Sequence, residues 1–381
     1  LAVAVSAGIL LGRRAGSPGV NVLALGLTAL VLVVLTAVFD SVMIGAGLFT
    51  YAEHLISGIR IGLAPIEDFA YPLATVAALP ALWAVLTRTG GVPMSTLLRH
   101  AFVASRPISW INTAFPFGAA MLLTTGRVDW LLVIGFLYYL VPYNLAMYGI
   151  NDVFDYESDL HNPRKGGIEG ALLPRRLHRP LLWLVVATNV PFLLVLVAAG
   201  SPTAWVAIAI STFAVIAYSA PPMRFKERPV LDSLTSSTHF VSPAVVGLTL
   251  AGAQIDLPLV LLLSAFFLWG MAAHAFGAVQ DIVPDREAGI GSIATVFGAR
   301  VTVRLSILLW AVAGMLMLAT PWPGPLAAIV AVPYILNAAP WWRVSDEASA
   351  ATNRSWRRFI WLNYASGFVI TMILILAGAT T

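Results

Sequence analysis

The fold class is decided by the stretch DWLLVIGFLYYLVPYNLAMYGINDVFDYESD (residues 129–159), which joins an uncharged apolar run to a cluster of acids. A helix over residues 129–150 is long enough to cross a hydrocarbon core of roughly 30 Å. Similar runs recur along the chain, whose 381 residues are 59% hydrophobic and only 10% charged. Since a soluble domain carries roughly 25% charged residues, the composition excludes a soluble globular protein and predicts an all-α integral membrane protein.

Twelve apolar runs are expected to form membrane helices, the first of them too short to span by itself. They cover residues 1–11, 20–39, 69–87, 108–125, 129–150, 180–199, 202–220, 236–253, 257–279, 301–319, 323–339 and 358–378. The segment 87–107 contains Gly90, Gly91 and Pro93 among basic residues and looks like a linker. We therefore expect a three-helix domain over residues 1–92 and a nine-helix domain over residues 93–381.

The Lys and Arg residues predict which helix ends face the cytoplasm. If the helices alternate in direction, all 22 Lys and Arg residues except Arg60 and Arg127 fall on one side. The positive-inside rule makes this side cytoplasmic and the protein a multi-pass protein of the cell membrane. The formal charge of +4 is therefore a topology signal and not a nucleic-acid-binding surface, because the basic residues are dispersed between spans. Cysteine is absent, which excludes disulfides and thiolate sites.

Acidic residues directly follow the run at 129–150. Asn151, Asp155 and Asp159 are spaced four residues apart, so on a continuing helix they share one face, with Asp152 three residues from Asp155. Carboxylates this close repel one another unless a cation lies among them. Mg²⁺ prefers oxygen ligands and is typically held by one or two carboxylates together with water and substrate phosphates. The spacing predicts a magnesium site formed by Asp152, Asp155 and Asp159.

A second acidic pair, Asp281 and Asp285, follows the run at 257–279 on the same predicted side of the membrane. These acids are again four residues apart, so the two clusters can converge and share the metal. Pro284 between them is expected to bend the helix end. One acidic cluster after a membrane helix is most often solvated charge, but two clusters with matched spacing and topology favour a metal site.

The loop Tyr218-Ser-Ala-Pro-Pro-Met-Arg-Phe-Lys226 emerges on the same side, between the two clusters along the chain. Its prolines stiffen the turn, and Arg224 and Lys226 offer charged donors to phosphate oxygens. The acids and this loop together predict a site for a metal-bound diphosphate.

This set of residues resembles the UbiA superfamily of intramembrane prenyltransferases. The family's first motif falls on Asn151, Asp155 and Asp159, its second on Asp281 and Asp285, and its Tyr-Ser-x-Pro-Pro loop on residues 218–226. The resemblance covers about residues 100–381 and implies a nine-helix UbiA-type bundle. It also implies Mg²⁺ bridging the aspartates and an allylic diphosphate, which ionises to an allylic cation. The implied catalytic carboxylates are Asp155, Asp159, Asp281 and Asp285, and the implied diphosphate-binding residues are Asn151, Arg164, Lys165, Tyr218, Ser219, Arg224 and Lys226.

The first three helices narrow the acceptor substrate. Pro65, Glu67 and Asp68 resemble the Pro-x-Glu-Glu type signature of the small membrane lycopene cyclases, with Asp in place of the second Glu. Ring closure of a polyene needs one proton donated and one removed, and paired carboxylates in an apolar site suit both steps. The distribution of Lys and Arg predicts that Glu67 and Asp68 lie on the other side of the membrane from the diphosphate site.

Together the two resemblances imply a fusion of a C50 carotenoid cyclase subunit with a lycopene elongase. The implied partners are dimethylallyl diphosphate, lycopene or another long polyene, the lipid bilayer and a second cyclase subunit. Glu67 and Asp68 would serve ring closure and not prenyl transfer.

Two other functions remain open on the sequence. One is prenylation of a quinone-type aromatic acceptor, with the first three helices as an anchor. The other is non-enzymatic cation transport, although the acids lie at helix ends and not deep within the spans. His239 and His274 stand alone near helix ends, and we interpret them as hydrogen-bonded structural residues.

Overall fold

The computed structural model of the chain describes residues 22–46, 50–52, 56–76, 93–159 and 172–380. The chain divides into two compact units, Leu1–Thr96 and Leu97–Thr381.

The first unit contains a long helix, α2 (Val22–Gly45), which is apolar and long enough to cross a membrane. Two short strands, β1 (Arg60–Ile61) and β2 (Ala64–Pro65), pair as an antiparallel hairpin. The 3-10 helix η2 (Ile66–Phe69) follows directly and leads into helical residues 70–76. Of the three helices predicted here, residues 1–11 and 77–87 lie outside the described residues.

The hairpin is fixed to the end of α2. Gly62 in its turn has a φ of 66°, and a side chain there would come within 2.6 Å of Ser41 Oγ on α2. Glycine avoids both the backbone strain and this clash. Leu63 N donates to the same Ser41 Oγ (2.9 Å), so the residues after the turn are placed beside α2.

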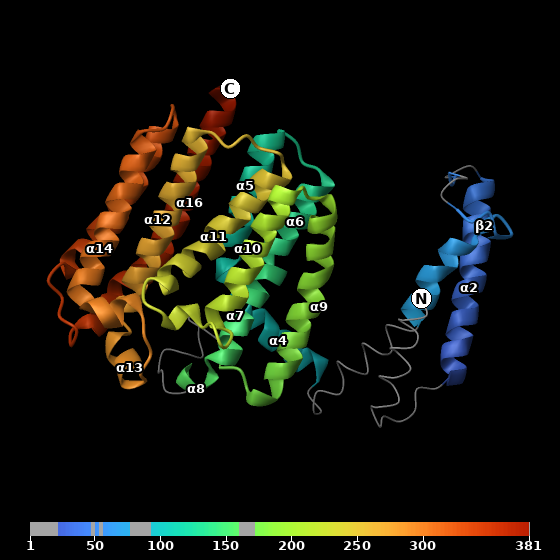
Figure 1. The fold of residues 1–381 in the computed structure, drawn as a ribbon, viewed down its shortest axis with the longest axis horizontal. Coiled ribbons are helices and arrows are strands. Elements are labelled where there is room, and N and C mark those ends of the chain that lie inside the picture. The colour runs from blue at the N-terminus through green and yellow to red at the C-terminus, as the bar shows by residue number, and fades with distance from the viewer. Residues whose placement is uncertain (1–21, 47–49, 53–55, 77–92, 160–171, 381) are drawn as a thin grey trace. The chain divides into compact units, whose positions relative to one another are not determined.

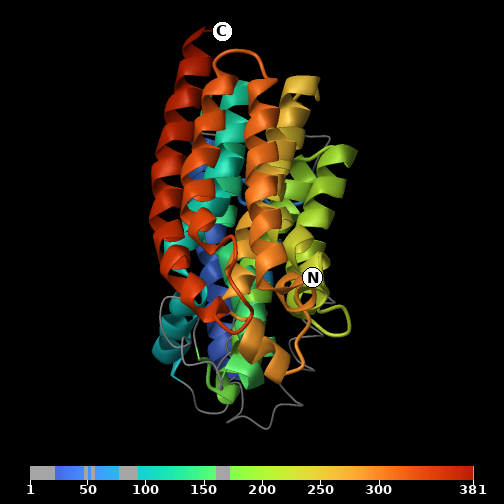
Figure 2. The same cartoon turned by 90° about the vertical axis from the view of Figure 1, so that its left-hand side faces the viewer.

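The second unit is a bundle of long helices that run side by side (Figure 1, Figure 2). Its helices are α4 (Met94–Ala104), α5 (Trp110–Thr125), α6 (Trp130–Leu140), α7 (Pro142–Phe154), α8 (Tyr156–Asp159), α9 (Arg175–Ala199), α10 (Pro202–Ser219), α11 (Leu231–Leu250), α12 (Leu257–Val279), α13 (Ile282–Glu287), α14 (Ile293–Leu318), α15 (Ala331–Ala338) and α16 (Asn353–Thr380), of which α4 begins in the first unit. The 3-10 segments are η3 (Pro107–Ser109), η4 (Phe225–Glu227), η5 (Gly324–Val330), η6 (Ala339–Trp341) and η7 (Ser349–Thr352). The short helices α8 and α13 lie at the same end of the bundle (Figure 1).

The nine helices predicted for this unit are present in the described residues, with α6 and α7 forming one of them and η5 and α15 another. Within the described chain, eight helices are long and apolar enough to cross a membrane. Two of the nine predicted spans do not reach this length and hydropathy. Helix α5 has only 16 residues, and α11 contains Asp232, His239 and several Ser and Thr. The protein is a multi-pass, all-α membrane protein, and many side chains of α11, polar ones included, are buried in the bundle.

Several helices begin earlier than their apolar runs. Helix α9 begins at Arg175 and not near residue 180, and α11 begins at Leu231 and not near 236. The predicted boundaries stopped at charged residues, but backbone hydrogen bonding continues through them. Long charged side chains at a helix end can reach water or polar partners while the backbone stays helical.

Packing differs between the two sides of the bundle. Thr113 Oγ1 donates to Tyr139 O (2.7 Å) and accepts from Asn144 Nδ2 (2.7 Å), which links α5, α6 and α7 through buried polar groups. On the other side, the ring centres of Trp310 and Tyr334 are 5.6 Å apart and those of Tyr334 and Phe359 are 5.2 Å apart. Such ring pairs each add about 0.5–1.5 kcal/mol beyond their buried area, and here they join α14, α15 and α16.

Candidate active site

The end of α7 carries the first motif. Asn151 Nδ2 donates to Asp155 Oδ2 (2.6 Å), so these two residues share a face as predicted. The same amide donates to Ser219 Oγ (3.1 Å) at the end of α10. The helix ends at Phe154, and Asp155 lies at the break with only 7% of its surface exposed. A carboxylate buried to this extent requires a compensating charge.

Two cations from the loop after α10 supply that charge. Lys226 Nζ forms an ion pair with Asp155 Oδ1, and Arg224 Nη2 lies 3.9 Å from the same oxygen. Arg224 also binds the Glu227 carboxylate, and this hydrogen bond raises the pKa of the guanidinium above its usual value. The structure therefore joins the predicted diphosphate loop to the predicted metal ligand.

Asp152 has a different environment. Its side chain is fully buried, and Arg106 Nη2 donates to its Oδ1 at 3.2 Å. The Arg106 guanidinium also lies 4.2 Å from the centre of the Tyr148 ring, a cation–π contact. Arg106 was not identified from the sequence because it lies 46 residues before its partner and carries no local motif. Metal binding by Asp152 stays a prediction, and the contact that the structure gives it is an ion pair with Arg106.

The second motif lies at the junction of α12 and α13. Asp285 N donates to Asp281 O (2.9 Å), so the two acids are one helical turn apart. Helix α12 ends at Val279, and Pro284 is the third residue of α13. In the first turn of a helix the missing proline N–H leaves no hydrogen bond unmade. The chain therefore bends at the motif, as Pro284 led us to expect.

Arg286 anchors the second motif to its surroundings. Its Nη1 donates to Asp346 Oδ2 and its Nη2 to Thr295 O, both at 2.7 Å. A hydrogen bond from Ala299 N, with the Arg286 guanidinium, holds the pKa of Asp346 below its usual value. These contacts fix α13 against the first turns of α14.

The loop after α13 packs against the loop after α10. A side chain at Gly291 would come within 2.7 Å of Glu227 O, so glycine permits this close approach of two backbones. Ile293 N donates to Asp232 Oδ2 (2.7 Å) at the start of α11. The segment that follows Asp281 and the loop that carries Lys226 are thus neighbours at one end of the bundle.

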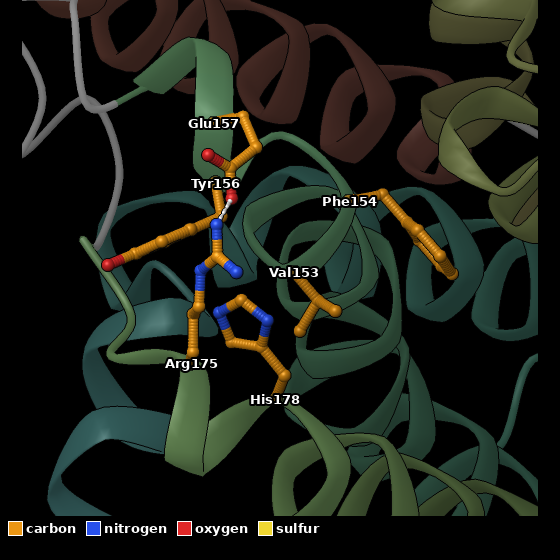
Figure 3. A pocket seen from close by; sticks show the side chains of 6 residues that line it. All are labelled: Val153, Phe154, Tyr156, Glu157, Arg175 and His178. Carbon is orange, nitrogen blue, oxygen red and sulfur yellow. Dashed lines mark hydrogen bonds and ion pairs between the residues drawn. The ribbon is translucent and has the colours of Figure 1, made fainter.

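Helix α8 is fixed to α9 around a small hollow (Figure 3). Arg175 forms an ion pair with Glu157, and its guanidinium lies 5.7 Å from the centre of the Tyr156 ring. The His178 ring meets Tyr156 edge-on, with 4.9 Å between the ring centres. These contacts position α8, whose last residue is Asp159.

A cluster that the sequence did not predict adjoins the first motif. Tyr218 lies between His239 and His274, at ring-centre distances of 5.1 and 6.3 Å. His274 Nε2 is 3.8 Å from Oδ2 of the fully buried Asp232. Tyr218 is also within electrostatic range of Asp155. The members come from α10, α11 and α12, so no local sequence pattern reveals them, and the interpretation of both histidines as isolated residues missed this arrangement.

Each predicted acid of the first unit accepts a hydrogen bond from a different residue. Glu67 Oε1 accepts from Ser57 N (2.7 Å), which holds the pKa of Glu67 below its usual value. Asp68 Oδ2 accepts from Tyr51 Oη (2.8 Å), and this bond raises the pKa of Tyr51 to about 12. The carboxyl group of Asp68 also lies near that of Asp40 on α2. Ring closure by Glu67 and Asp68 stays a prediction.

Arg164, Lys165 and the side chain of Asp159 lie outside what the structure describes. Among the described residues, no group of three His, Asp or Glu side chains could hold a metal ion by itself. The Asp155, Asp281 and Asp285 carboxylates nevertheless fit Mg²⁺. This ion takes one or two protein carboxylates and completes its shell with water and phosphate oxygens.

Relatives of known function cover most of the chain. The C(50) beta-cyclic carotenoids biosynthesis protein LbtBC of Dietzia sp. is 48% identical over 382 residues, which cover 91% of this chain and 88% of the relative. The lycopene elongase/hydratase of Corynebacterium glutamicum is 51% identical over 282 residues, which cover 74% of this chain and 98% of the relative.

Solved structures share the fold of the bundle. A UbiA homolog from Archaeoglobus fulgidus, bound to DMAPP and Mg²⁺, superposes with a TM-score of 0.50 at 21% identity and covers 70% of this chain and 98% of its own. A digeranylgeranylglyceryl phosphate synthase superposes with a TM-score of 0.54 at 14% identity and covers 75% and 99%. The model of the UbiA prenyltransferase family matches residues 113–363, and the chain therefore belongs to this family.

Proposed function

We propose that the chain is a lycopene elongase, which transfers dimethylallyl groups from dimethylallyl diphosphate to the terminal double bonds of lycopene. Two relatives at 48% and 51% identity, one a C50 carotenoid biosynthesis protein and the other a lycopene elongase/hydratase, support this acceptor. One observation carries the proposal: Asn151 donates to both Asp155 and Ser219, and Lys226 forms an ion pair with Asp155. These contacts join the first acidic motif to the basic loop.

The residues divide the work of ionising the donor. Asp155 and Asp159 of the first motif and Asp281 and Asp285 of the second would hold Mg²⁺, which would supply positive charge to neutralise the leaving diphosphate. Lys226 and Arg224 donate to phosphate oxygens from one side of the site. Further contacts to the diphosphate are proposed for Asn151, Arg164, Lys165, Tyr218 and Ser219. The carbon–oxygen bond then breaks with its electron pair on the diphosphate, and the allylic cation adds to the polyene.

Lys226 changes partner in this scheme. Without substrate it neutralises Asp155, whose carboxylate is nearly buried. With Asp155 as a metal ligand, the ammonium group would be free to donate to a phosphate oxygen. The buried charge stays balanced before and after binding, so neither state leaves an unpaired charge in the bundle.

An apolar hollow between α11 and α12 is the proposed position for the end of the polyene. Its lining includes Val241 on one helix and Leu263, Phe267 and Leu268 on the other, and its volume is about 380 Å³. Sites for small ligands commonly measure about 300–1,000 Å³. Apolar walls also keep water away from the allylic cation until it reacts.

The first unit is proposed to be the cyclase subunit. Asp68, which has the Asp40 carboxyl as a neighbour, would supply the proton for ring closure, and Glu67, whose lowered pKa keeps it ionised at neutral pH, would accept the proton lost afterwards. We expect a second cyclase subunit to complete the cavity around the polyene end. The protein is proposed to lie in the cell membrane, with the prenyltransferase site facing the cytoplasm.

Substitution of either motif tests the elongase proposal. Asp155→Ala and Asp281→Ala should each lower elongation at least about 100-fold, in line with the loss of a preorganised charge-stabilising group. The assay is formation of elongated carotenoid, by mass, in lycopene-containing membranes supplied with dimethylallyl diphosphate. Chelation of Mg²⁺ should give the same loss and metal addition should reverse it.

Glu157→Ala is the matched control. Glu157 is an exposed acid only two residues from Asp155, and it pairs with Arg175 on the surface. This variant should retain activity within about threefold, because exposed ion pairs contribute little. Full elongation by Asp155→Ala, or by the wild type in excess chelator, would refute the metal–diphosphate site.

A further inference from the structure

Two histidines lie on either side of Tyr218 in the second unit, one on α11 and one on α12. Both ring contacts are edge-on, with interplanar angles of 79° for His239 and 80° for His274. The two imidazoles nevertheless have different surroundings, and the difference decides which of them can hold a proton.

His274 lies beside a buried carboxylate. Its Nε2 is 3.8 Å from Asp232 Oδ2, and Asp232 is 0% exposed. The carboxylate also accepts from Ser233 N and Ile293 N, each at 2.7 Å, which fixes its orientation. Among the described residues, His274 is the basic side chain found within 4 Å of Asp232. A proton taken up by His274 therefore creates a charge that Asp232 stabilises.

His239 has the opposite environment. It is 3% exposed and lies beside the backbone of Ala214. Its Nε2 makes no hydrogen bond within the described part of the chain, and no carboxylate there lies within 4 Å of it. A proton on this ring would be an unpaired charge in the bundle interior, which is unfavourable. His239 therefore suits a neutral control for His274.

His274 also lies between the acids and the apolar hollow. Phe267 and His274 are seven residues apart and fall on one stripe of α12, and Asp281 follows seven residues later, in the turn after the helix ends at Val279. Seven residues correspond to about 10 Å of helix. Phe267 lines the hollow, and Asp281 belongs to the second acidic motif. The imidazole is thus one step deeper in the bundle than the diphosphate end of the site.

We propose that His274 accepts the proton released at the end of prenyl transfer, with Asp232 as its positioning residue. This inference rests on the proposed elongase function. When the allylic cation adds to the terminal alkene, the alkene electron pair forms the new carbon–carbon bond and leaves a tertiary cation on the neighbouring carbon. That cation is discharged by loss of a C–H proton, whose bonding pair becomes a new double bond, or by addition of water and loss of a proton from its oxygen.

Each route releases one proton and transfers no electrons to an acceptor. Nε2 of His274 is the ring nitrogen nearest Asp232, which leaves Nδ1 to take the proton. The resulting imidazolium is balanced by the Asp232 carboxylate until the proton leaves the site. The same base serves an elongase that forms an alkene and one that forms an alcohol.

The test compares two numbers from one sample of the full-length protein in lycopene-containing membranes. The first is the amount of elongated carotenoid. The second is the extent of donor ionisation, measured as diphosphate release together with migration of a bridging ¹⁸O label to non-bridging positions in recovered dimethylallyl diphosphate. Because both come from the same protein, their ratio does not depend on how much of a variant is folded.

For His274→Asn we expect ionisation within about threefold of wild type and a carotenoid-to-ionisation ratio lowered at least about 100-fold, the lower end for loss of a general base. Asp232→Asn should lower the ratio less, because the base is kept and only its charge partner is lost. His239→Asn, which removes the other ring beside Tyr218, should leave the ratio unchanged.

A wild-type ratio for His274→Asn overturns the proposal. An equal fall of ionisation and carotenoid formation leaves this ratio at the wild-type value and overturns the proposal in the same way. If the wild type ionises the donor but prenylates no polyene, the elongase function itself fails, which is a separate result from either of these.

Discussion

At Asp155 a single buried carboxylate contacts an amide, an ammonium group and a guanidinium group, contributed by the end of α7 and the loop after α10. Charges with this little exposure are tolerated only with partners of good geometry. The pairing with Lys226 gives the ligand-free protein a stable arrangement of the same residues that are proposed to bind metal and phosphate.

Lys226→Met should therefore change both stability and activity. Leaving the Asp155 carboxylate without its nearest cation should destabilise the protein by about 3 kcal/mol, the lower end for a broken buried pair. Elongation should fall about 10- to 100-fold because a phosphate donor is lost. Thermal unfolding in detergent and the carotenoid assay measure the two effects.

Added Mg²⁺ should raise the melting temperature of Lys226→Met more than that of the wild type, since the ion can then supply the missing charge to Asp155. Lys226→Arg retains a cation and is the control for charge. If Lys226→Met melts like the wild type without metal, the Asp155–Lys226 pair has no structural role.

Residues with local patterns could be predicted from the sequence, and residues that meet across the fold could not. Asn151 and Asp155 are four residues apart, so helical geometry alone places them together. Asp232 meets Ile293 across 61 residues, and Asp68 meets Asp40 on another element. A lone acid at the start of a helix has no distinguishing sequence signal, so its partner must be seen in the fold.

At the scale of elements, the junction of α12 and α13 determines how the second motif is presented. The chain turns after Val279 and resumes a helix at Ile282, with Asp281 in between. Pro284 cannot continue α12, because its ring would collide with the carbonyl four residues before it. The direction of the Asp285 carboxylate thus depends on this proline.

Pro284→Ala should allow α12 and α13 to join as a more continuous helix and should turn Asp285 away from its present direction. We expect no loss of thermal stability, because alanine favours a helix. Elongation should fall at least about tenfold, since small misplacements of reacting groups cost up to about 100-fold. The carotenoid assay and thermal unfolding, run side by side, separate the two quantities.

Pro258→Ala is the matched control, because Pro258 occupies the first turn of α12 at the other end of the helix. That variant should elongate like the wild type. Unchanged activity in Pro284→Ala would mean that the bend does not direct Asp285.

Long apolar helices could be predicted because hydropathy and length alone decide them. The β1–β2 hairpin could not, because two strands of two residues each have no detectable alternation. It is formed by the turn at Gly62 and by the bond from Leu63 N to Ser41, and the latter joins segments 22 residues apart. The arrangement of Glu67 and Asp68 depends on this hairpin and was therefore predicted only in part.

For the whole molecule, the distribution of Lys and Arg predicts the orientation in the membrane even though α5 is short and α11 carries several polar residues. The chain has no cysteine, so single cysteines can be introduced without background labelling. Arg176→Cys, at the start of α9, should be labelled by an impermeant maleimide only from the cytoplasmic side. Arg127→Cys, after α5, should be labelled only from outside. Labelling of both from one side would show that the predicted alternation of helices is wrong.

The division of the chain into two units predicts that ring closure and elongation can be lost separately. Asp68→Asn removes the carboxyl group proposed to donate the proton, and Glu67→Gln keeps an acceptor for Ser57 N but removes the base. Each variant, expressed in lycopene-producing cells with the partner cyclase subunit, should form an elongated but acyclic C50 carotenoid at near wild-type yield. Pigment mass and absorption measure both steps at once.

The partner is needed because Glu67 and Asp68 are half-exposed in this chain alone, and burial beneath a second subunit would strengthen the coupling between the carboxyl groups. Loss of elongation in either variant, or cyclic product from both, would contradict this division of labour.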